Sequence, residues 1–258
     1  HPGGTPMSGP PPVPVQGQQA PRFSLVVPIY NEEDNVAALL DEVHEVLSPH
    51  GPVEALMVDD GSTDRSVAAM RAWKARHNAH WLRILRLERN GGQSAAVLAG
   101  AKVAAAPIVC TMDGDLQNDP RDLPRMFELM TQGPDVGVVG VRVSRQDSFT
   151  RVMSSRIGNW FRNHITRVVV TDAACGSKAF RREVFLSVPR FHGMHRFMAT
   201  LARMQGVEVV ELAVHHRPRV AGVAKYGIGN RALRGRWDCM SVRWLAARRI
   251  APVIRDEL

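Results

Sequence analysis

The sequence predicts an α/β protein built on a doubly wound, mostly parallel sheet, with amphipathic helices toward its C-terminal end. Short β-branched runs alternate with segments of helical period through the first half of the chain, the pattern of a parallel sheet covered by helices. Acidic or polar motifs directly follow three of those runs, where the strands of such a sheet end. With 45% hydrophobic residues among 258, the chain can bury a sizeable core.

The first two strands open two strand–helix units. Residues 23–28 form a compact β-branched run that a polar segment breaks, so they predict the first strand. Residues 35–47 carry apolar side chains at helical spacing. Residues 55–58 repeat the strand pattern, and Thr63 or Asp64 can cap the helix that follows the next acidic turn.

The same alternation continues through the middle of the chain. Residues 82–87 predict a third strand, and an alanine-rich helix is expected over 94–105. The run at 108–112 predicts a fourth, buried strand. A helix over 123–130 and a continuous apolar strand at 136–141 come next. Strands and helices of these lengths imply parallel pairing.

The pattern changes after the fifth strand. Residues 148–170 predict a basic, amphipathic helix, which either packs on the sheet with a solvated arginine face or meets a membrane interface. Later strands are expected at 176–181 and 207–215, with helices between them. Beyond Tyr226 the chain is again helical, basic and rich in tryptophan.

Composition predicts one large domain with appendages. Residues 1–22, rich in Pro, Gly and Gln, predict a disordered tail without the apolar core of a signal peptide. Residues 23–227 form the expected catalytic domain, and 228–258 a basic helical segment that can associate with a membrane. No apolar run reaches the roughly 18 residues that span a bilayer. Three widely spaced cysteines without a CxxC motif argue against a disulfide framework or a structural zinc.

The fourth strand runs into the motif TMDGDLQNDP. Asp113 and Asp115 flank a glycine that lets the chain turn between them, and Gln117 offers a third oxygen. Hard oxygen ligands of this kind suit Mg²⁺ or Mn²⁺, which substrate phosphates and water normally complete. The alternative is a polar turn that caps a helix at Asp119 and Pro120.

Charge and motif placement exclude two function classes. The net charge of +8 and the isoelectric point near 10.2 indicate an anionic partner. Nucleic acid does not fit, because Asp59, Asp60, Asp113 and Asp115 crowd one predicted sheet edge. A dinucleotide-dependent dehydrogenase does not fit either, because residues 28–35 contain no glycine.

Several ordered motifs between Phe23 and Tyr226 resemble those of the family-2 inverting glycosyltransferases, which have the Rossmann-like GT-A fold. Within that family the chain resembles the dolichyl-phosphate and polyprenyl-phosphate sugar transferases, the dolichyl-phosphate mannosyltransferases among them. Two departures are Gly114, where alanine is frequent, and Ala224 before Lys225 and Tyr226, where serine is usual. The motifs that carry the resemblance are VVPIYNEEDNV, MVDDGSTDRS, NGGQSAAVLAG, TMDGDLQNDP, the segment ending at Arg142, DAACGSKAFRREV, GMHRF and HHRPRVAGVAKYG.

The resemblance implies a role for each matching residue. The metal would lie on Asp113, Asp115 and Gln117, and Asp115 would be essential for catalysis. Arg142 and Arg156 would receive the acceptor phosphate. The nucleotide sugar would contact Pro28, Tyr30, Glu32, Asp59, Asp113, Gly114, Arg196, Arg219 and Lys225.

The expected reaction moves a hexose from GDP-mannose or a UDP-sugar to a polyprenyl or dolichyl phosphate. A lipid phosphate is ionised near pH 7 and needs no general base, whereas a saccharide hydroxyl, the alternative acceptor, needs a carboxylate to take its proton. Residues 172–183 supply Asp172 and Glu183 but not the Glu-Asp pair usual in hydroxyl-directed transferases. The expected location is cytoplasmic and peripheral, on the inner face of a membrane. A membrane subunit or a homo-oligomer stays open.

Overall fold

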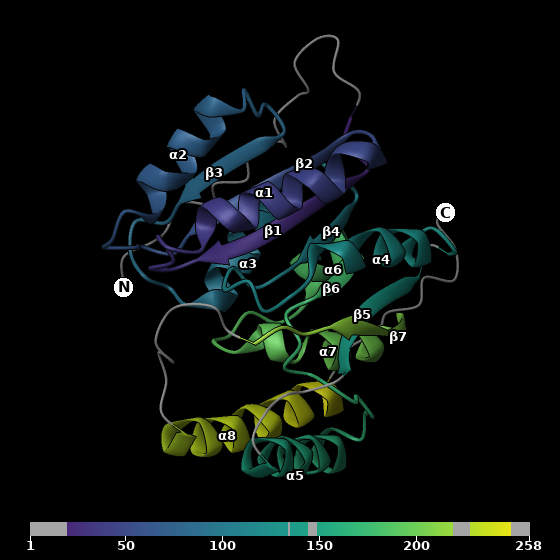
Figure 1. Ribbon diagram of the computed structural model, residues 1–258. Coiled ribbons are helices and arrows are strands. Elements are labelled where there is room, and N and C mark those ends of the chain that lie inside the picture. Colours follow the sequence, from purple (N-terminus) through teal and green to yellow (C-terminus); the bar gives the residue numbers. More distant parts are fainter. Residues whose placement is uncertain (1–19, 134, 144–148, 219–227, 249–258) are drawn as a thin grey trace, which may run out of the picture.

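The computed structural model describes residues 20–133, 135–143, 149–218 and 228–248. Its centre is one seven-stranded sheet with the order β3-β2-β1-β4-β6-β5-β7 (Figure 1). Strands β3, β2, β1 and β4 are mutually parallel, as are β5 and β7. The α/β, mostly parallel sheet that the sequence predicts is therefore confirmed.

The first half of the chain folds as alternating strands and helices, in the predicted order. Polar turns separate the elements, and strands β1, β2 and β4 are largely buried because helices cover both faces of a parallel sheet. The elements are β1 (Phe23–Ile29), α1 (Val36–Leu47), β2 (Val53–Asp59), α2 (Ser66–Arg76), β3 (Leu82–Arg86), α3 (Gln93–Val103), β4 (Ile108–Thr111), α4 (Leu123–Met130) and β5 (Val136–Val143).

The second half interrupts the parallel order. Strand β6 pairs antiparallel with β4 on one side and with β5 on the other, so the chain enters the sheet there in the reverse direction after the long helix α5. The elements are α5 (Phe149–Thr166), β6 (Lys178–Arg181), α6 (Arg182–Ser187), α7 (Met198–Met204), β7 (Glu208–His215) and α8 (Ile228–Ala247), with single 3₁₀ turns at Ser48–His50, Pro120–Asp122 and Met194–Arg196.

The core has two layers, one on each face of the sheet. Side chains of β1 alternate between them: Leu25 and Val27 pack with α1, α2 and α4, whereas Val26 packs with α3 and the α6–α7 region. Gly100 on α3 allows close packing, because a Cβ there would lie 2.4 Å from Val26 Cγ1. The three polar motifs are thereby fixed at one edge of the sheet.

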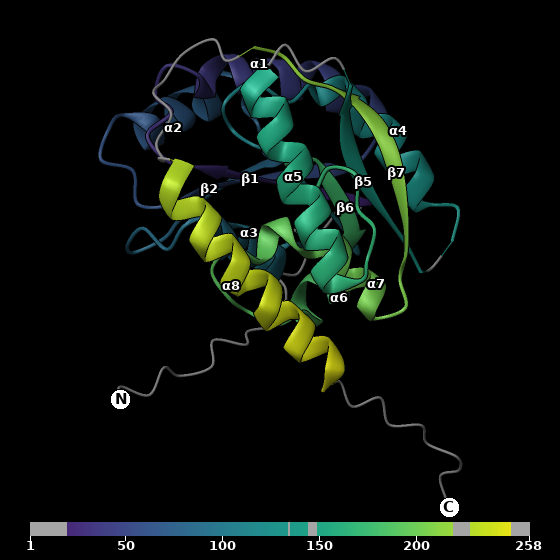
Figure 2. The ribbon, with the colours of Figure 1, turned by 90° about the horizontal axis from the view of Figure 1, so that it is seen from below.

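Helices α5 and α8 lie side by side outside the second layer (Figures 1 and 2). Arg243 Nη1 on α8 donates a hydrogen bond to the Ile165 carbonyl of α5 at 3.0 Å, and Cys239 and Val242 of α8 join the core. Among the described residues, no helix has both the length and the apolarity needed to cross a membrane.

Helices α2 and α5 have boundaries that differ from the prediction. Helix α2 begins at Ser66, and Asp64 Oδ1 accepts hydrogen bonds from both the backbone and the hydroxyl of Ser66, so the aspartate supports the start of the helix. Helix α5 ends at Thr166, where Arg167 adopts a positive φ of 57°. The predicted tail at 1–22 falls almost wholly outside the described residues.

Candidate active site

Side chains join the loop after β1 to the loop after β2. Ser62 Oγ accepts a hydrogen bond from Asn31 N at 3.0 Å, and Asn31 Oδ1 accepts one from Thr63 N at 2.8 Å. Ser66 Oγ accepts another from Glu32 N at 2.8 Å. Asn31 has a φ of 52°, a left-handed conformation that asparagine tolerates better than most residues. These contacts fix the loop that carries Tyr30 and Glu32, the two predicted nucleotide contacts.

Two neighbouring aspartates end β2. Asp59 is fully buried; its Oδ1 accepts a hydrogen bond from Ser62 N, while its buried Oδ2 has no hydrogen-bond partner among the described residues. Arg86 Nε lies 3.8 Å from that oxygen. Asp60 Oδ1 accepts a hydrogen bond from Gly91 N at 2.7 Å, although burial raises its pKa. Asp59 therefore keeps an acceptor for a ligand, and Asp60 anchors the third loop.

Asp113 follows β4 and forms the acidic part of the site. Its Oδ1 accepts a hydrogen bond from Gln93 Nε2 at 2.7 Å, at the start of α3. Burial and then the charge of Asp115 raise the pKa of Asp113 to about 6. Gly176 makes room for the carboxylate, because a Cβ at that position would lie 2.3 Å from Asp113 Oδ2.

The backbone turn after Asp113 differs in one detail from the prediction. Gly114 is required for close packing, since a Cβ there would lie 2.6 Å from Ile29 Cδ1 and 2.9 Å from the Pro28 carbonyl oxygen. The positive φ, 61°, occurs instead at Leu116, a conformation that costs a branched residue roughly 1–2 kcal/mol. That turn carries Gln117, whose Nε2 donates to the Arg217 carbonyl at 3.4 Å.

The acidic turn fits a divalent cation. Asp113, Asp115 and Gln117 carry oxygen atoms of the kind that Mg²⁺ and Mn²⁺ prefer, and burial, followed by the charge of Asp115, raises the pKa of Asp113. In the described part of the chain, no three His, Cys, Asp or Glu side chains gather into a metal site. A cation held here would therefore share its coordination with a ligand.

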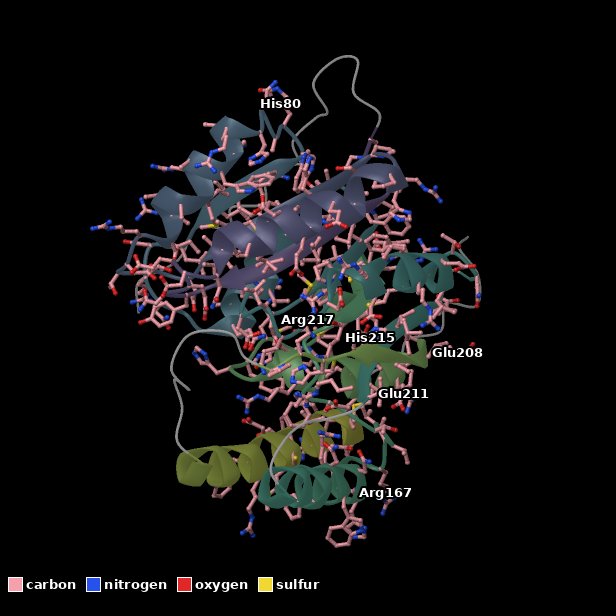
Figure 3. The ribbon with its side chains drawn as sticks, viewed as in Figure 1. His80, Arg167, Glu208, Glu211, His215 and Arg217 are labelled. Atoms are coloured by element: carbon pink, nitrogen blue, oxygen red, sulfur yellow. The ribbon has the colours of Figure 1, made fainter. Side chains whose placement is uncertain are left out.

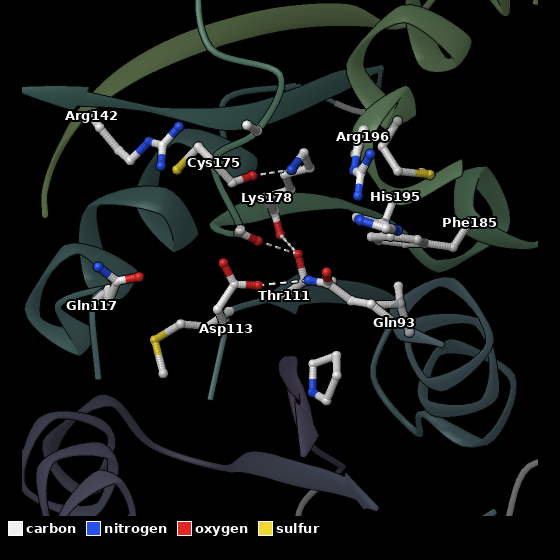
Figure 4. Close-up of a pocket in the computed structure, with 16 residues that line it drawn as sticks. Gln93, Thr111, Asp113, Gln117, Arg142, Cys175, Lys178, Phe185, His195 and Arg196 are labelled. Carbon is white, nitrogen blue, oxygen red and sulfur yellow. Dashed lines mark hydrogen bonds between the residues drawn. The ribbon is translucent and has the colours of Figure 1, made fainter. Parts of the chain in front are cut away.

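A cavity of about 400 Å³ lies above the acidic turn, on the α3 and α7 side of the sheet (Figure 4). This size falls within the range of about 300–1,000 Å³ usual for ligand pockets. Basic side chains line one side of it, and Asp113 with Gln93 lines the other. Of the predicted site residues it brings together Pro28, Asp113, Gln117, Arg142 and Arg196.

Arg142, at the end of β5, does not stand free in this cavity. Its Nε donates to Asp172 Oδ2 at 2.7 Å and its Nη2 to Asp172 Oδ1 at 2.9 Å. Both side chains are largely buried, with 14% and 6% exposed. A bidentate pair of this kind fixes the guanidinium plane, so the predicted acceptor-phosphate residue is held in place by a carboxylate.

Two further groups in the cavity were not predicted. Lys178, at the start of β6, is 5% exposed, and its ammonium donates a hydrogen bond to the Cys175 carbonyl. Ser94 Oγ lies 2.7 Å from His195 Nδ1 and accepts a hydrogen bond from Gly193 N. The sequence contained a signal for both, because Lys178 and His195 stand inside motifs of the family resemblance.

The end of β7 is tied to the acidic turn. Arg217 N donates to the Gln117 carbonyl at 2.8 Å, and the Arg217 guanidinium pairs with Asp119 at 2.7 Å and Glu42 at 2.8 Å. Figure 3 shows Arg217 near the middle of the view, next to His215. Asp119 also accepts a hydrogen bond from Arg121 N, so the alternative reading, a turn that caps a helix, describes the same segment correctly.

Three predicted residues are not described at the side-chain level. Arg219 and Lys225 lie outside the described residues, and so does the side chain of Arg156 on α5. Their assignments to the nucleotide sugar and to the acceptor phosphate stay predictions.

The comparisons with known proteins agree with the fold and the motifs. A family model described as Glycosyl transferase family 2 matches residues 24–188. The dodecaprenyl-phosphate galacturonate synthase of Rhizobium johnstonii is 39% identical over 251 residues, which cover 93% of this chain and 72% of that protein. A second relative is the undecaprenyl-phosphate 4-deoxy-4-formamido-L-arabinose transferase of Pectobacterium atrosepticum, which is 36% identical over 204 residues. The match covers 79% of this chain and 62% of the relative, so the chain spans less than two thirds of that relative's length.

Solved structures share the fold at lower identity. The Pyrobaculum calidifontis mannosyltransferase PcManGT, in complex with GDP-Man and Mn²⁺, has a TM-score of 0.63 and 23% identity, covering 92% of this chain and 66% of that one. Glucosyl-3-phosphoglycerate synthase from Mycobacterium tuberculosis, in complex with Mn²⁺, UDP and glucosyl-3-phosphoglycerate, has a TM-score of 0.64 and 18% identity, covering 88% of this chain and 79% of that one. The GT-A-type fold expected from the resemblance is confirmed.

Proposed function

The chain belongs to glycosyl transferase family 2, and we propose that it transfers a sugar from a nucleotide sugar to a polyprenyl phosphate. The observation that carries the proposal is one cavity with Asp113 on one side and Arg142 on the other. A donor diphosphate and an acceptor phosphate need charges of this kind at neighbouring positions. The names of the two relatives, each a transferase or synthase of a polyprenyl phosphate, support this acceptor.

On the donor side, Asp59 and its loop would hold the nucleoside, and Pro28, Tyr30 and Glu32 would border it. Asp113, Asp115 and Gln117 would hold Mg²⁺ or Mn²⁺ on the diphosphate. When bound, the ion would neutralise charge on the leaving diphosphate. Arg196, which lines the cavity, and the predicted bases Arg219 and Lys225 would add to that neutralisation.

On the acceptor side, Arg142 and Arg156 would bind the phosphate. Its second pKa near 6 leaves it largely ionised at pH 7, so the nucleophile needs no base. A saccharide hydroxyl would need one, and Asp172 is poorly placed for that role because Arg142 donates to both of its oxygens. This pairing favours the phosphate acceptor over a hydroxyl.

We also place the protein at a membrane surface. Three tryptophans on the paired helices α5 and α8 are strongly exposed: Trp160 at 66%, Trp237 at 70% and Trp244 at 57%. Tryptophan beside arginine is typical of helices that lie in a membrane interface. Phe161, in contrast, is half-buried beneath the guanidinium of Arg236, so it does not join the three tryptophans on the exposed surface.

The test is a transfer assay with purified full-length protein. The donors are GDP-mannose, UDP-hexoses and a nucleotide-linked galacturonate, each with and without undecaprenyl phosphate, in Mg²⁺, Mn²⁺ or excess chelator. We expect one donor to yield a lipid-linked sugar only when lipid phosphate and a divalent ion are both present. Transfer to saccharide hydroxyls with none to the lipid phosphate would overturn the proposal.

A further inference from the structure

Lys178 lies between the two halves of the site. The sheet order β2-β1-β4-β6-β5 sets Asp59, Asp113, Lys178 and Arg142 in succession along one edge. Because β6 is antiparallel, its first residue pairs with Thr111, the last residue of β4. Lys178 therefore stands at the boundary between the predicted donor ligand Asp113 and the predicted acceptor ligand Arg142.

Among the described side chains of the proposed acceptor side, the Arg142–Asp172 pair contributes no net positive charge. Arg142 is the predicted phosphate ligand whose side chain is described, and Asp172 accepts two of its guanidinium hydrogen bonds. The pair is formally neutral. A phosphate that carries between one and two negative charges near pH 7 needs a positive charge beyond that pair.

Among the described residues, no carboxylate forms an ion pair with the ammonium of Lys178. The ammonium has three N–H donors, and its one hydrogen bond among the described residues goes to the neutral Cys175 carbonyl. The side chain lines the cavity, and only 5% of the residue is exposed to solvent. Burial lowers the pKa of Lys178, and the nearby charges of Asp113 and Asp172 oppose that shift. A buried lysine without a paired carboxylate is costly to stability, which is typical of a group kept for a ligand.

We propose that Lys178 binds the acceptor phosphate directly and supplies the positive charge that the Arg142–Asp172 pair does not. This inference rests on the proposed function. In the transfer, an acceptor phosphate oxygen forms a bond to the anomeric carbon while the bond from that carbon to the donor phosphate breaks, and the electron pair leaves on the nucleoside diphosphate. Lys178 keeps its proton throughout and orients the attacking oxygen.

The sign of the transition-state charge also favours the phosphate over the sugar. The anomeric carbon becomes partly cationic during glycosyl transfer, and an ammonium facing it would be repelled. A lysine that contacts the attacking phosphate instead attracts the nucleophile. Its role differs from that of Arg196, which the family resemblance assigns to the donor.

The experiment compares Lys178→Met and Lys178→Arg with wild type, using undecaprenyl phosphate in detergent micelles and the donor that the wild type accepts. Methionine keeps approximately the length and the apolar stem of the lysine side chain but carries no charge. We expect Lys178→Met to lower kcat/KM for undecaprenyl phosphate by roughly 10- to 100-fold, the usual effect of one charge-assisted contact. The KM for the donor should not change, and Lys178→Arg should recover part of the loss. Lys102→Met, at an exposed lysine of α3, is the matched control and should behave as wild type.

The outcomes are distinct. If wild type transfers no sugar to undecaprenyl phosphate, the proposed function fails before Lys178 is tested. If wild type is active and Lys178→Met changes the donor KM but not the acceptor KM, the lysine belongs to the donor diphosphate and the inference is wrong. Equal loss in Lys178→Met and Lys178→Arg, with a lower unfolding temperature in both, would mean a structural role and would also overturn it.

Discussion

The proposed donor and acceptor sides of the site each contain a carboxylate, half-buried Asp113 and buried Asp172, but the two have different partners. Asp113 accepts a hydrogen bond from the neutral amide of Gln93, and burial beside Asp115 raises its pKa to about 6. Asp172 instead forms a bidentate ion pair with the guanidinium of Arg142. The donor side thus leaves negative charge available for an added cation, whereas the acceptor side is balanced by the chain itself.

This difference indicates how each side acts. A carboxylate that accepts only a neutral hydrogen bond would be suited to ligate a metal that arrives with the substrate. A buried carboxylate paired with arginine orients that arginine and keeps the site folded when it is empty. Substitutions on the donor side should therefore affect the reaction more than the fold, and substitutions of the Arg142–Asp172 pair should affect both.

The largest effect is expected at Asp115. Asp115→Asn keeps the shape of the side chain but removes a proposed metal ligand, so transfer should fall by about 10²–10³-fold or more, as when a stabilising group for transition-state charge is lost. Donor affinity should fall with it, and the unfolding temperature should stay near that of wild type. Full activity in excess chelator, or in Asp115→Asn, would contradict the assignment. Asp34→Asn, at an exposed position in the loop after β1, is the control.

The pair on the acceptor side predicts a different signature. Arg142→Ala removes the bidentate partner of the buried Asp172 and should cost about 3–5 kcal/mol of unfolding free energy, measured by denaturant unfolding. Arg142→Ala combined with Asp172→Asn should recover most of that stability without recovering transfer. A single variant as stable as wild type would mean that the ion pair does not hold this side together.

Arg156 differs from Arg142 because its proposed role is only to bind the acceptor phosphate. Arg156→Ala should raise the KM for lipid phosphate by roughly ten- to a hundredfold, since a charge-assisted contact contributes about 1.5–3 kcal/mol. Donor affinity should be nearly unchanged. A variant with normal lipid dependence and weakened donor binding would move Arg156 to the donor side.

Asp113 allows a pH test of the donor side in metal-free protein. Its pKa is 3.8 ordinarily and about 6 in the folded chain, so the folded state holds the proton more tightly. The stability that this proton contributes is fully present below pH 3.8 and is lost as pH rises to about 6. Asp113→Asn should therefore unfold at a higher temperature than wild type above pH 6, and the difference should shrink toward pH 4. Equal unfolding temperatures at pH 8 would contradict the raised pKa.

The structures of the two sides could be predicted from the sequence to different extents. Strands β1 to β4 and the motifs at their ends follow from apolar runs interrupted by Asp59 or Asp113, because a short parallel strand buried on both faces has a local signature. The reversed direction of β6 and the pairing of Arg142 with Asp172 depend on contacts between residues 30 positions apart, which no local pattern encodes. Lys178 has no local signature of a site residue, because its position beside Asp113 and Arg142 depends on the sheet order.

The smallest effect per residue is expected for membrane binding. It distinguishes the two sides of the site because only one of them should face the membrane. Helices α5 and α8 lie on the far side of the molecule from α2 (Figure 1), so the lipid should approach one end while the nucleotide sugar arrives at the other. Each basic residue near an anionic bilayer contributes on the order of 1 kcal/mol, an attraction that salt screens. Exposed Arg167 and Arg243, with the three tryptophans, form the proposed contact surface.

Vesicle sedimentation tests this orientation. Binding of the full chain should rise with the fraction of anionic lipid, fall with added salt, and weaken when Trp160 and Trp237 are changed to serine. Arg167→Ser should weaken it slightly, whereas Arg76→Ser, at an exposed arginine of α2, should not. If the tryptophan variants bind as wild type does while Arg76→Ser lowers binding, the end of the molecule with α2 faces the membrane. In that case the lipid phosphate would have to reach Arg142 from the donor side, and the separation of the two sides would be wrong.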